Sequence, residues 1–233
     1  MASWPRVSRL GEETWLVEYE PELDLAINRR VHHLARAIAS APRVGIRDVV
    51  PGMASLAVHV DGDRVDDREM AEWLDRTIAT ASADVAEGAL HELPVCYEPP
   101  FALDIGDVAR RCECAVSDVI ERHSAREYHV FMVGFLPGFP YLGVLDPRLS
   151  LPRRDVPRQV VPRGSVAIAG VQTGIYPTDS PGGWHVIGRT PVALFDATAT
   201  PPGRLAPGDR VRFVPVPASR FESLVANTAE ATQ

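Results

Sequence analysis

The sequence predicts an α+β protein of two domains, a small α/β sandwich followed by a β-barrel. At 233 residues the chain is long enough for one large domain or two small ones. Its first third alternates strand-like runs with two amphipathic helical segments. From about residue 91 onward, short strand-like runs are separated by Gly and Pro turns, a pattern typical of a barrel or sandwich.

The first third of the chain carries helix start signals in two places. Asp24 precedes apolar residues at helical spacing, and the run from Asp66 to Glu69 has the form of a capping box. The order β-α-β-β-α is that of a split βαβ, ferredoxin-like sandwich. The expected elements are strands at 14–19, 44–50 and 55–60, a helix at 24–39 and a second helix after Asp66.

A polar, alanine-rich stretch at 79–89 marks the expected domain boundary. We therefore expect domains at 1–85 and 86–218, with a flexible polar tail at 219–233. The expected elements of the second domain are strands at 91–97, 128–133, 166–169, 192–196 and 211–216, with short helices at 104–111 and 117–122.

Composition excludes several classes of function. No apolar run approaches the ~20 residues that span a bilayer, and the N-terminus lacks a signal-peptide core, so we expect a cytoplasmic protein. The net charge of −7 argues against nucleic acid as the main partner. Three cysteines make neither a disulfide framework nor a zinc site at the spacing of Cys112 and Cys114, and we expect no metal.

All 24 basic residues are arginine. A chain without lysine has no Schiff-base lysine, no biotinylated lysine and no phosphate-loop lysine. Its positive charge is presented only as planar guanidinium, which suits carboxylates and phosphates. The sequence also has no Walker motif and no G-x-G-x-x-G after a strand, so a nucleotide site would be atypical or on another chain.

Residues 134–191 hold nine of the 21 prolines and nine of the 17 glycines, together with five aromatic residues. This composition predicts a rigid, turn-dense surface built around a ligand or a partner. Within it, arginines 148, 153, 154, 158 and 163 each lie near a proline, which stiffens the backbone. Arg153 and Arg158 are favoured to clamp an anion bidentately, against the alternative of an acid-paired strand edge.

The loop GFLPGFPYLG at 134–143 has glycines that permit unusual backbone conformations and exposed N–H groups that can hold an oxyanion. Its aromatics either wall a small pocket or pack into the core as part of a structural turn. The candidate substrate contacts in this loop are Gly134, Phe135, Pro137, Gly138, Phe139 and Tyr141.

The segment at 169–191 supplies neutral donors and acceptors at Gln172, Thr173, Tyr176 and Ser180, as expected for binding a small polar amide, and Ser180 and Trp184 are candidate substrate contacts. Ser180 has acidic and histidine neighbours but no G-x-S-x-G elbow, which argues against a hydrolase triad. His123, at the end of an expected helix, is a candidate group for titration near neutrality or a helix cap.

Three motif strings together resemble one family. They are H-x(4)-Y-x-V-x(3)-G-F-x-P-G-F-P-Y-L-G, then L-P-R-R-x-x-P-R-x-x-V-P-x-G-S-V-A-I-A-G-x-Q-T-G-I-Y-P, then S-P-G-G-W-x-x-I-G-R-T-P. This pattern is similar to the carboxyltransferase subdomain C/D family, which includes the B subunit of 5-oxoprolinase, the sporulation kinase A inhibitor and allophanate hydrolase subunit 1. The resemblance runs from about residue 10 to about 216.

The resemblance implies a small N-terminal α/β domain and a cyclophilin-like β-barrel. It also implies a complex with a carboxyltransferase subdomain A/B partner (the C subunit) and a lactamase-like partner (the A subunit). Such a complex would catalyse the ATP-dependent opening of 5-oxoproline to glutamate. A fused relative in urea amidolyase carboxylates urea with biotin, and this chain, without lysine, is not the biotin carrier.

For that reaction the resemblance and the residues suggest Arg158, Gln172 and Tyr176 as the catalytic set. Arg153 or Arg158 would hold an anion, and the amide would bond to Gln172 and Tyr176. Two alternatives stay open: a regulator that binds a histidine kinase through the barrel, and half of a biotin-dependent carboxyltransferase.

Overall fold

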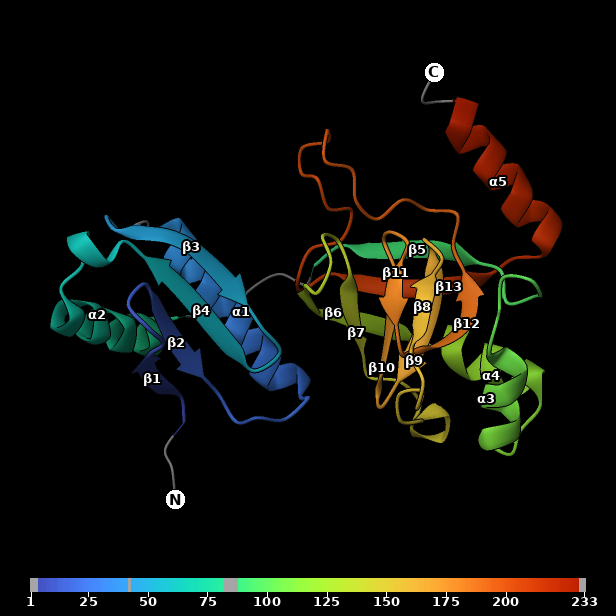
Figure 1. The fold of residues 1–233 in the computed structure, drawn as a ribbon. Helices are drawn as coiled ribbons and strands as arrows, with labels where there is room; N and C mark the ends of the chain where they lie inside the picture. Colours follow the sequence, from blue (N-terminus) through green and yellow to red (C-terminus); the bar gives the residue numbers. More distant parts are fainter. Residues whose placement is uncertain (1–3, 42, 82–87, 231–233) are drawn as a thin grey trace. The chain divides into compact units, whose positions relative to one another are not determined.

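The computed structural model describes residues 4–41, 43–81 and 88–230. The chain divides into two compact units, residues 1–87 and 88–233 (Figure 1). None of the described helices is long and apolar enough to cross a membrane.

The N-terminal unit is an antiparallel four-stranded sheet with two helices. Its elements are β1 (Arg6–Arg9), β2 (Thr14–Glu18), α1 (Leu25–Ser40), β3 (Ile46–Pro51), β4 (Ser55–Val60), a short 3₁₀ turn at 62–64 and α2 (Asp67–Thr80). The strand order is β1-β2-β4-β3, so β4 lies between the two strands that α1 connects. This split βαβ arrangement confirms the expected ferredoxin-like sandwich.

Local signals account for most of the N-terminal unit. The carboxylates of Asp24 and Asp66 accept from the backbone N–H groups of Ile27 (2.9 Å) and Glu69 (3.0 Å), so both expected helix starts are confirmed. Alternate residues of β2 and β4 are buried against the helices. Strand β1 was not expected from the sequence, because its residues are mostly exposed and show no alternation.

The C-terminal unit is built around a seven-stranded sheet. Its elements are β5 (Leu90–Val95), α3 (Ile105–Arg111), α4 (Val116–Ser124), β6 (Glu127–Val133), β7 (Pro140–Gly143), a 3₁₀ turn at 147–149, β8 (Arg158–Val161), β9 (Ser165–Ala169), β10 (Gln172–Ile175), β11 (Ser180–Gly182), β12 (His185–Arg189), β13 (Arg210–Pro215) and α5 (Ala218–Glu230).

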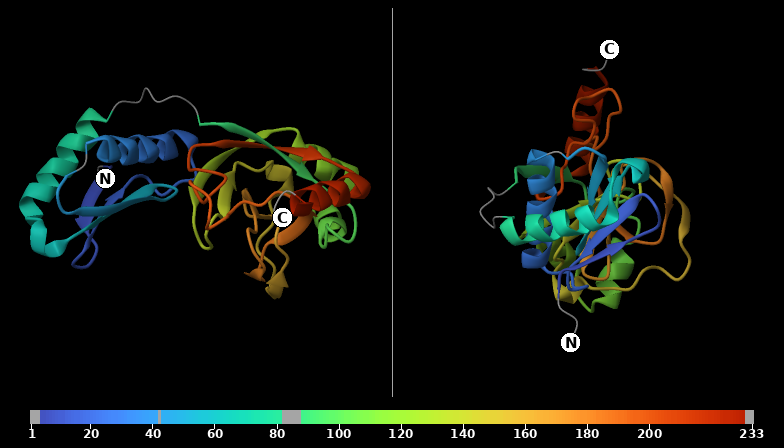
Figure 2. Two further views of the ribbon diagram at one scale, coloured as in Figure 1. Left: turned by 90° about the horizontal axis from the view of Figure 1, so that it is seen from above. Right: turned by 90° about the vertical axis from the view of Figure 1, so that its left-hand side faces the viewer.

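The seven-stranded sheet curls into a barrel (Figure 2). The strand order is β12-β9-β10-β7-β6-β13-β5. The two edges meet where Cys96, directly after β5, and Arg189, at the end of β12, exchange two backbone hydrogen bonds of 2.9 Å. Strands β8 and β11 form a separate two-stranded ribbon. The expected barrel of short strands is therefore confirmed.

Strand β9 is buried on both faces and separates two clusters of side chains. Val166 and Ile168 point into the barrel interior, whereas Ala167 and Ala169 belong to a second cluster on the outer face. The same alternation continues on β10, which places Ile175 inside and Tyr176, just beyond the strand, outside.

One expectation for this unit is wrong. Residues 192–196 form no strand, because Leu194 and Asp196 bond to the backbone of 202–204 and close a local loop instead of pairing with the barrel. Most of the stretch expected as a tail from 219 belongs to helix α5, which extends away from the barrel and whose Phe221 packs on Phe101 at 4.2 Å between ring centroids (Figures 1 and 2).

Candidate functional site

Four aromatic residues gather on the outer face of β9 and β10, and we call them the aromatic cluster: Phe139, Tyr141, Tyr176 and Trp184. Phe139 is the hub, with edge-to-face contacts to the other three at centroid distances of 5.0, 5.2 and 5.7 Å. The cluster thus joins two motif segments more than thirty residues apart in sequence. Such contacts add about 0.5–1.5 kcal/mol each beyond area burial.

Glycines create the room for this packing. A side chain at Gly174 would place its Cβ 2.9 Å from Phe139 Cζ, and one at Gly182 would collide with the Tyr176 hydroxyl. Gly138 has a φ of +81° and lies against the side chain of Phe195. Gly174 and Gly182 therefore serve the packing of the cluster, and Gly138 serves the close approach of its loop to Phe195, rather than general loop flexibility.

The charge of Arg153 is near enough to Tyr141 and Tyr176 to lower the pKa values of both phenols. Burial raises the pKa of Tyr141, and the nearby Arg153 charge lowers it in part. Burial also raises the pKa of Tyr176, against smaller lowering effects from a backbone hydrogen bond of Trp184 and from Arg153. Both phenols therefore stay protonated at pH 7 and can donate a hydrogen bond.

The five arginines of the proline-rich stretch have different environments. Arg148 pairs with Asp146 (2.8 Å), and Arg154 and Arg158 both pair with Asp104. Within the part of the chain that the structure describes, neither Arg153 nor Arg163 has a carboxylate partner. The structure therefore leaves Arg153, and not Arg158, with an uncompensated charge next to the aromatic cluster.

Asp104 was not among the site residues expected from the sequence. It lies at the N-cap position of α3, but its side chain makes no cap hydrogen bond. Instead, the 4% exposed carboxylate accepts from Arg154 (2.9 Å), from both terminal nitrogens of Arg158 (2.7 and 2.6 Å) and from the Val186 N–H (2.7 Å). No pattern in the sequence signals this, because the partners lie 50 to 82 residues away.

Two further hydrogen bonds hold the same arginine loop to the start of β12 and the residues before it. Arg154 N–H donates to Gly183 O (2.8 Å), and His185 Nε2 donates to Pro152 O (2.9 Å). Asp179 accepts from Arg163 N–H. Ser180, Asp179 and His185 therefore each have separate partners, and their arrangement is not that of a catalytic triad.

The remaining candidates from these segments differ in exposure. Phe135 is 64% exposed at a φ of +69°, Pro137 is exposed, and Gly134 is half-buried. Gln172 is half-buried at the start of β10, on the same face as Gly174. Ser180 is buried in β11 and bonds only weakly to Pro181 O (3.4 Å).

His123 lies apart from the aromatic cluster, in the barrel interior. It accepts from Tyr97 Oη at Nδ1 (2.8 Å) and donates from Nε2 to Thr173 Oγ1 (2.9 Å), which in turn donates to Ala167 O (3.1 Å). This tautomer follows from the network. Burial lowers its pKa to about 3, so it is a neutral core residue at pH 7. The structure does not bring it to the cluster.

Comparison with known proteins gives consistent matches over nearly the whole chain. Two 5-oxoprolinase B subunits are 36% identical over 220 residues (Bacillus subtilis; 90% of this chain and 92% of the relative) and 41% identical over 206 residues (Escherichia coli O157:H7; 88% and 94%). A crystal structure of TTHA0988 matches with a TM-score of 0.79 and 36% identity, over 87% of this chain and 40% of that chain.

A more distant match is the Kluyveromyces lactis urea amidolyase, with a TM-score of 0.79 and 25% identity over 96% of this chain and 16% of that chain. This chain therefore corresponds to less than half of either solved chain. The family model described as carboxyltransferase domain, subdomain C and D, matches residues 5–205. With that match and those relatives, the chain belongs to the carboxyltransferase subdomain C and D family.

Proposed function

We propose that this chain is the B subunit of a cytoplasmic, ATP-dependent 5-oxoprolinase, which converts 5-oxoproline to L-glutamate. The observation that carries the proposal is the unpaired Arg153 guanidinium beside the protonated phenols of Tyr141 and Tyr176, in a chain that matches 5-oxoprolinase B subunits along 88–90% of its length. The substrate has the two matching groups, a carboxylate and a small cyclic amide.

In this proposal Arg153 binds the substrate carboxylate. A guanidinium binds a carboxylate through two parallel hydrogen bonds, and the stiff loop between Pro152 and Pro157 reduces the entropy lost on binding. Tyr141 donates a further hydrogen bond, and the exposed Phe135 and Pro137 cover the ring. Gln172 contacts the amide, while Tyr176, which is only 2% exposed, fixes the position of Trp184.

Opening the lactam needs activation. Transfer of the ATP γ-phosphoryl group to the amide oxygen would release ADP and activate the amide carbon. Attack by one water would then break the C–N bond of the ring and give γ-glutamyl phosphate, and a second water would release glutamate and phosphate. The growing negative charge suits Arg153 and the N–H groups of the 134–143 loop. Since the chain has no lysine and no Walker motif, we place the nucleotide site at least in part on another chain.

The proposed partners are a carboxyltransferase subdomain A/B protein and a lactamase-like protein, and we propose that this chain alone is inactive. The test is co-expression of all three, purification, and assay of ATP-dependent glutamate formation with each protein omitted in turn. Activity that disappears without this chain supports the proposal. A stable complex that forms no glutamate overturns it.

A second candidate is half of a biotin-dependent carboxyltransferase, favoured by the similarity to urea amidolyase. The same purified complex tests it when urea, bicarbonate, ATP and a biotinylated carrier with its carboxylase replace 5-oxoproline. Consumption of ATP that depends on urea, without glutamate formation from 5-oxoproline, would select this second function.

A further inference from the structure

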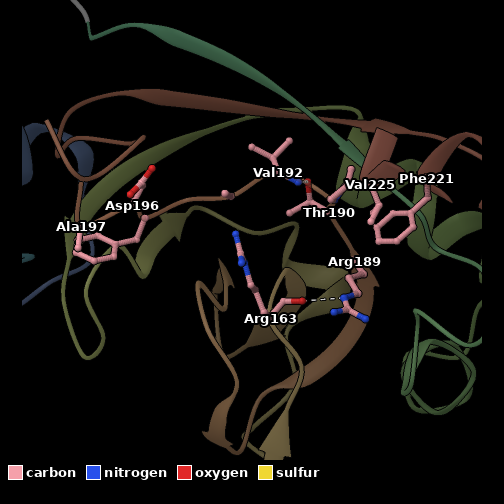
Figure 3. Close-up of a pocket in the computed structure, with 11 residues that line it drawn as sticks. Arg163, Arg189, Thr190, Val192, Asp196, Ala197, Phe221 and Val225 are labelled. Atoms are coloured by element: carbon pink, nitrogen blue, oxygen red, sulfur yellow. Dashed lines mark hydrogen bonds between the residues drawn. The ribbon is translucent and has the colours of Figure 1, made fainter. Parts of the chain in front are cut away.

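A groove of about 790 Å³ opens on the C-terminal unit between the barrel and α5 (Figure 3). None of its residues is among those proposed above to contact 5-oxoproline. Basic residues line one part and apolar residues the rest. The lining residues are Arg163, Arg189, Thr190, Pro191, Val192, Ala193, Phe195, Asp196, Ala197, Phe221 and Val225.

Two arginines give the groove a positive charge. Arg189 Nε donates to Arg163 O at 2.7 Å, which fixes the two residues side by side, and the guanidinium of Arg163 points into the open space of the groove (Figure 3). Neither guanidinium forms an ion pair with any carboxylate of the described residues. Other arginines of this unit, such as Arg126 and Arg210, are paired with acidic side chains.

The groove also exposes apolar side chains next to this charge. Val192 and Phe195 come from the loop after β12, and Phe221 and Val225 from α5. Val225 is 45% exposed, although moving an aliphatic side chain out of water is energetically favourable. The single acidic residue of the lining, Asp196, accepts hydrogen bonds from Thr198 N and Oγ1 and forms no ion pair with either arginine, so the lining keeps a net positive charge.

We propose that this groove binds a small organic acid with an apolar body. The carboxylate would pair with Arg163 and Arg189, and the body would cover Val192, Phe195 and Val225. Ligand sites are commonly concave, 300–1,000 Å³ in volume and mostly apolar, with a few polar groups that fix orientation. The exposed Arg163 and the half-buried Arg189, both without a carboxylate partner among the described residues, lie beside apolar surface and match a molecule that carries both features.

Binding of the probe, 3-phenylpropionate, to the purified full chain is measured by calorimetry and by two-dimensional NMR. 3-Phenylpropan-1-ol tests the need for the carboxylate, and acetate tests the need for the apolar body. We expect saturable binding of 3-phenylpropionate at about millimolar concentration or tighter, with each of the two control compounds at least about tenfold weaker.

Substitutions in the groove test whether the probe binds there. Arg163→Gln and Arg189→Gln should each weaken binding of 3-phenylpropionate about tenfold, and Val225→Glu should do the same by placing a like charge on exposed α5. Arg110→Gln, which removes an exposed arginine from α3, is the charge-matched control and should bind as the unchanged chain does. Circular dichroism and melting curves establish that each variant is folded.

Two outcomes overturn the proposal: no saturable binding at up to about 10 mM probe, or equal affinity in the arginine variants and the unchanged chain. Chemical-shift changes at 134–143 that leave 189–197 untouched would also overturn it. The measurement needs no partner protein and no turnover. It therefore succeeds or fails independently of the proposed 5-oxoprolinase reaction.

Discussion

Asp104 and Arg158 meet through two parallel hydrogen bonds, Nη1 to Oδ2 at 2.7 Å and Nη2 to Oδ1 at 2.6 Å. The carboxylate lies at the start of α3 and the guanidinium at the start of β8, so the pair ties the helical segment to the arginine loop. Because Arg154 shares the same carboxylate and the Pro152 carbonyl accepts from His185 Nε2, Arg153 lies between two anchored residues. Asp104 thus acts as a positioning residue for Arg153 in the proposed site.

Replacement of Asp104 by Asn should lower both stability and activity. The change leaves two partly buried guanidinium groups without a counter-charge, and breaking such a buried pair costs about 3 kcal/mol. We expect the melting temperature of the chain to fall by roughly 10 °C. In the assembled enzyme, KM for 5-oxoproline should rise more than kcat falls, because Arg153 loses its position.

Asp107→Asn is the matched control for that experiment. Asp107 lies one turn further along α3, and its exposed carboxylate pairs only with neighbouring arginines of the same helix. It should leave the melting temperature and KM almost unchanged. Equal behaviour of the two variants would refute the positioning role of Asp104.

Arg153→Gln should reduce kcat/KM for 5-oxoproline at least tenfold, which corresponds to about 1.4 kcal/mol of transition-state binding. The folded state should be unaffected, since no described carboxylate depends on Arg153. Arg148→Gln is the control, because Arg148 pairs with Asp146 instead. The ratio of kcat/KM for 5-oxoproline to kcat/KM for 2-pyrrolidinone, which lacks the carboxylate, should fall in Arg153→Gln only. Unaltered discrimination would remove Arg153 from carboxylate binding.

Gly138→Ala should destabilise the chain by about 2–3 kcal/mol. At a φ of +81° an alanine is strained, and its Cβ would lie 2.8 Å from Phe195 Cβ. Gly106→Ala in α3 meets open space and should instead stabilise by about 0.5–1 kcal/mol. Urea unfolding curves measure both. A Gly138→Ala variant as stable as the unchanged chain would show that the loop can move away from Phe195.

His123 should make stability depend on pH. Burial lowers its pKa in the folded chain to about 3, whereas the unfolded residue titrates near the usual 6.5. Between these values the unfolded state binds a proton that the folded state does not, so stability falls as the pH drops below about 6.5. From pH 7.5 to 5 the loss from this group is about 2 kcal/mol.

Urea unfolding at several pH values measures that loss, with His123→Gln as the comparison. The variant should show a smaller decrease over the same range, in which carboxylates of ordinary pKa remain ionised. NMR of the imidazole nitrogens should find His123 neutral at pH 5. A protonated ring at pH 5 in the folded protein would contradict the prediction.

Several elements could be predicted because their signals are local. Asp24 and Asp66 start helices through residues three positions away, and strand Ser55–Val60 follows from simple alternation. The strands near the motifs were missed because β7, β10 and β11 are short and contain Gly or Pro. Phe221 was expected to belong to a tail, because its packing partner Phe101 lies 120 residues earlier in the chain and gives no local signal.

The α+β class, the split βαβ order, the absence of lysine chemistry and the segments that carry the family motifs follow from the sequence alone. Which arginines of the proline-rich stretch lack a carboxylate partner depends on the tertiary structure. Asp104 pairs with Arg154 and Arg158 across 50 and 54 residues, while Arg153, directly before Arg154, stays unpaired among the described side chains. Likewise, His123 and Tyr176 are both polar ring residues of the motif strings, but the first lies inside the barrel and the second outside it. Charge and burial depend on such distant contacts, and a linear pattern carries information only about near neighbours.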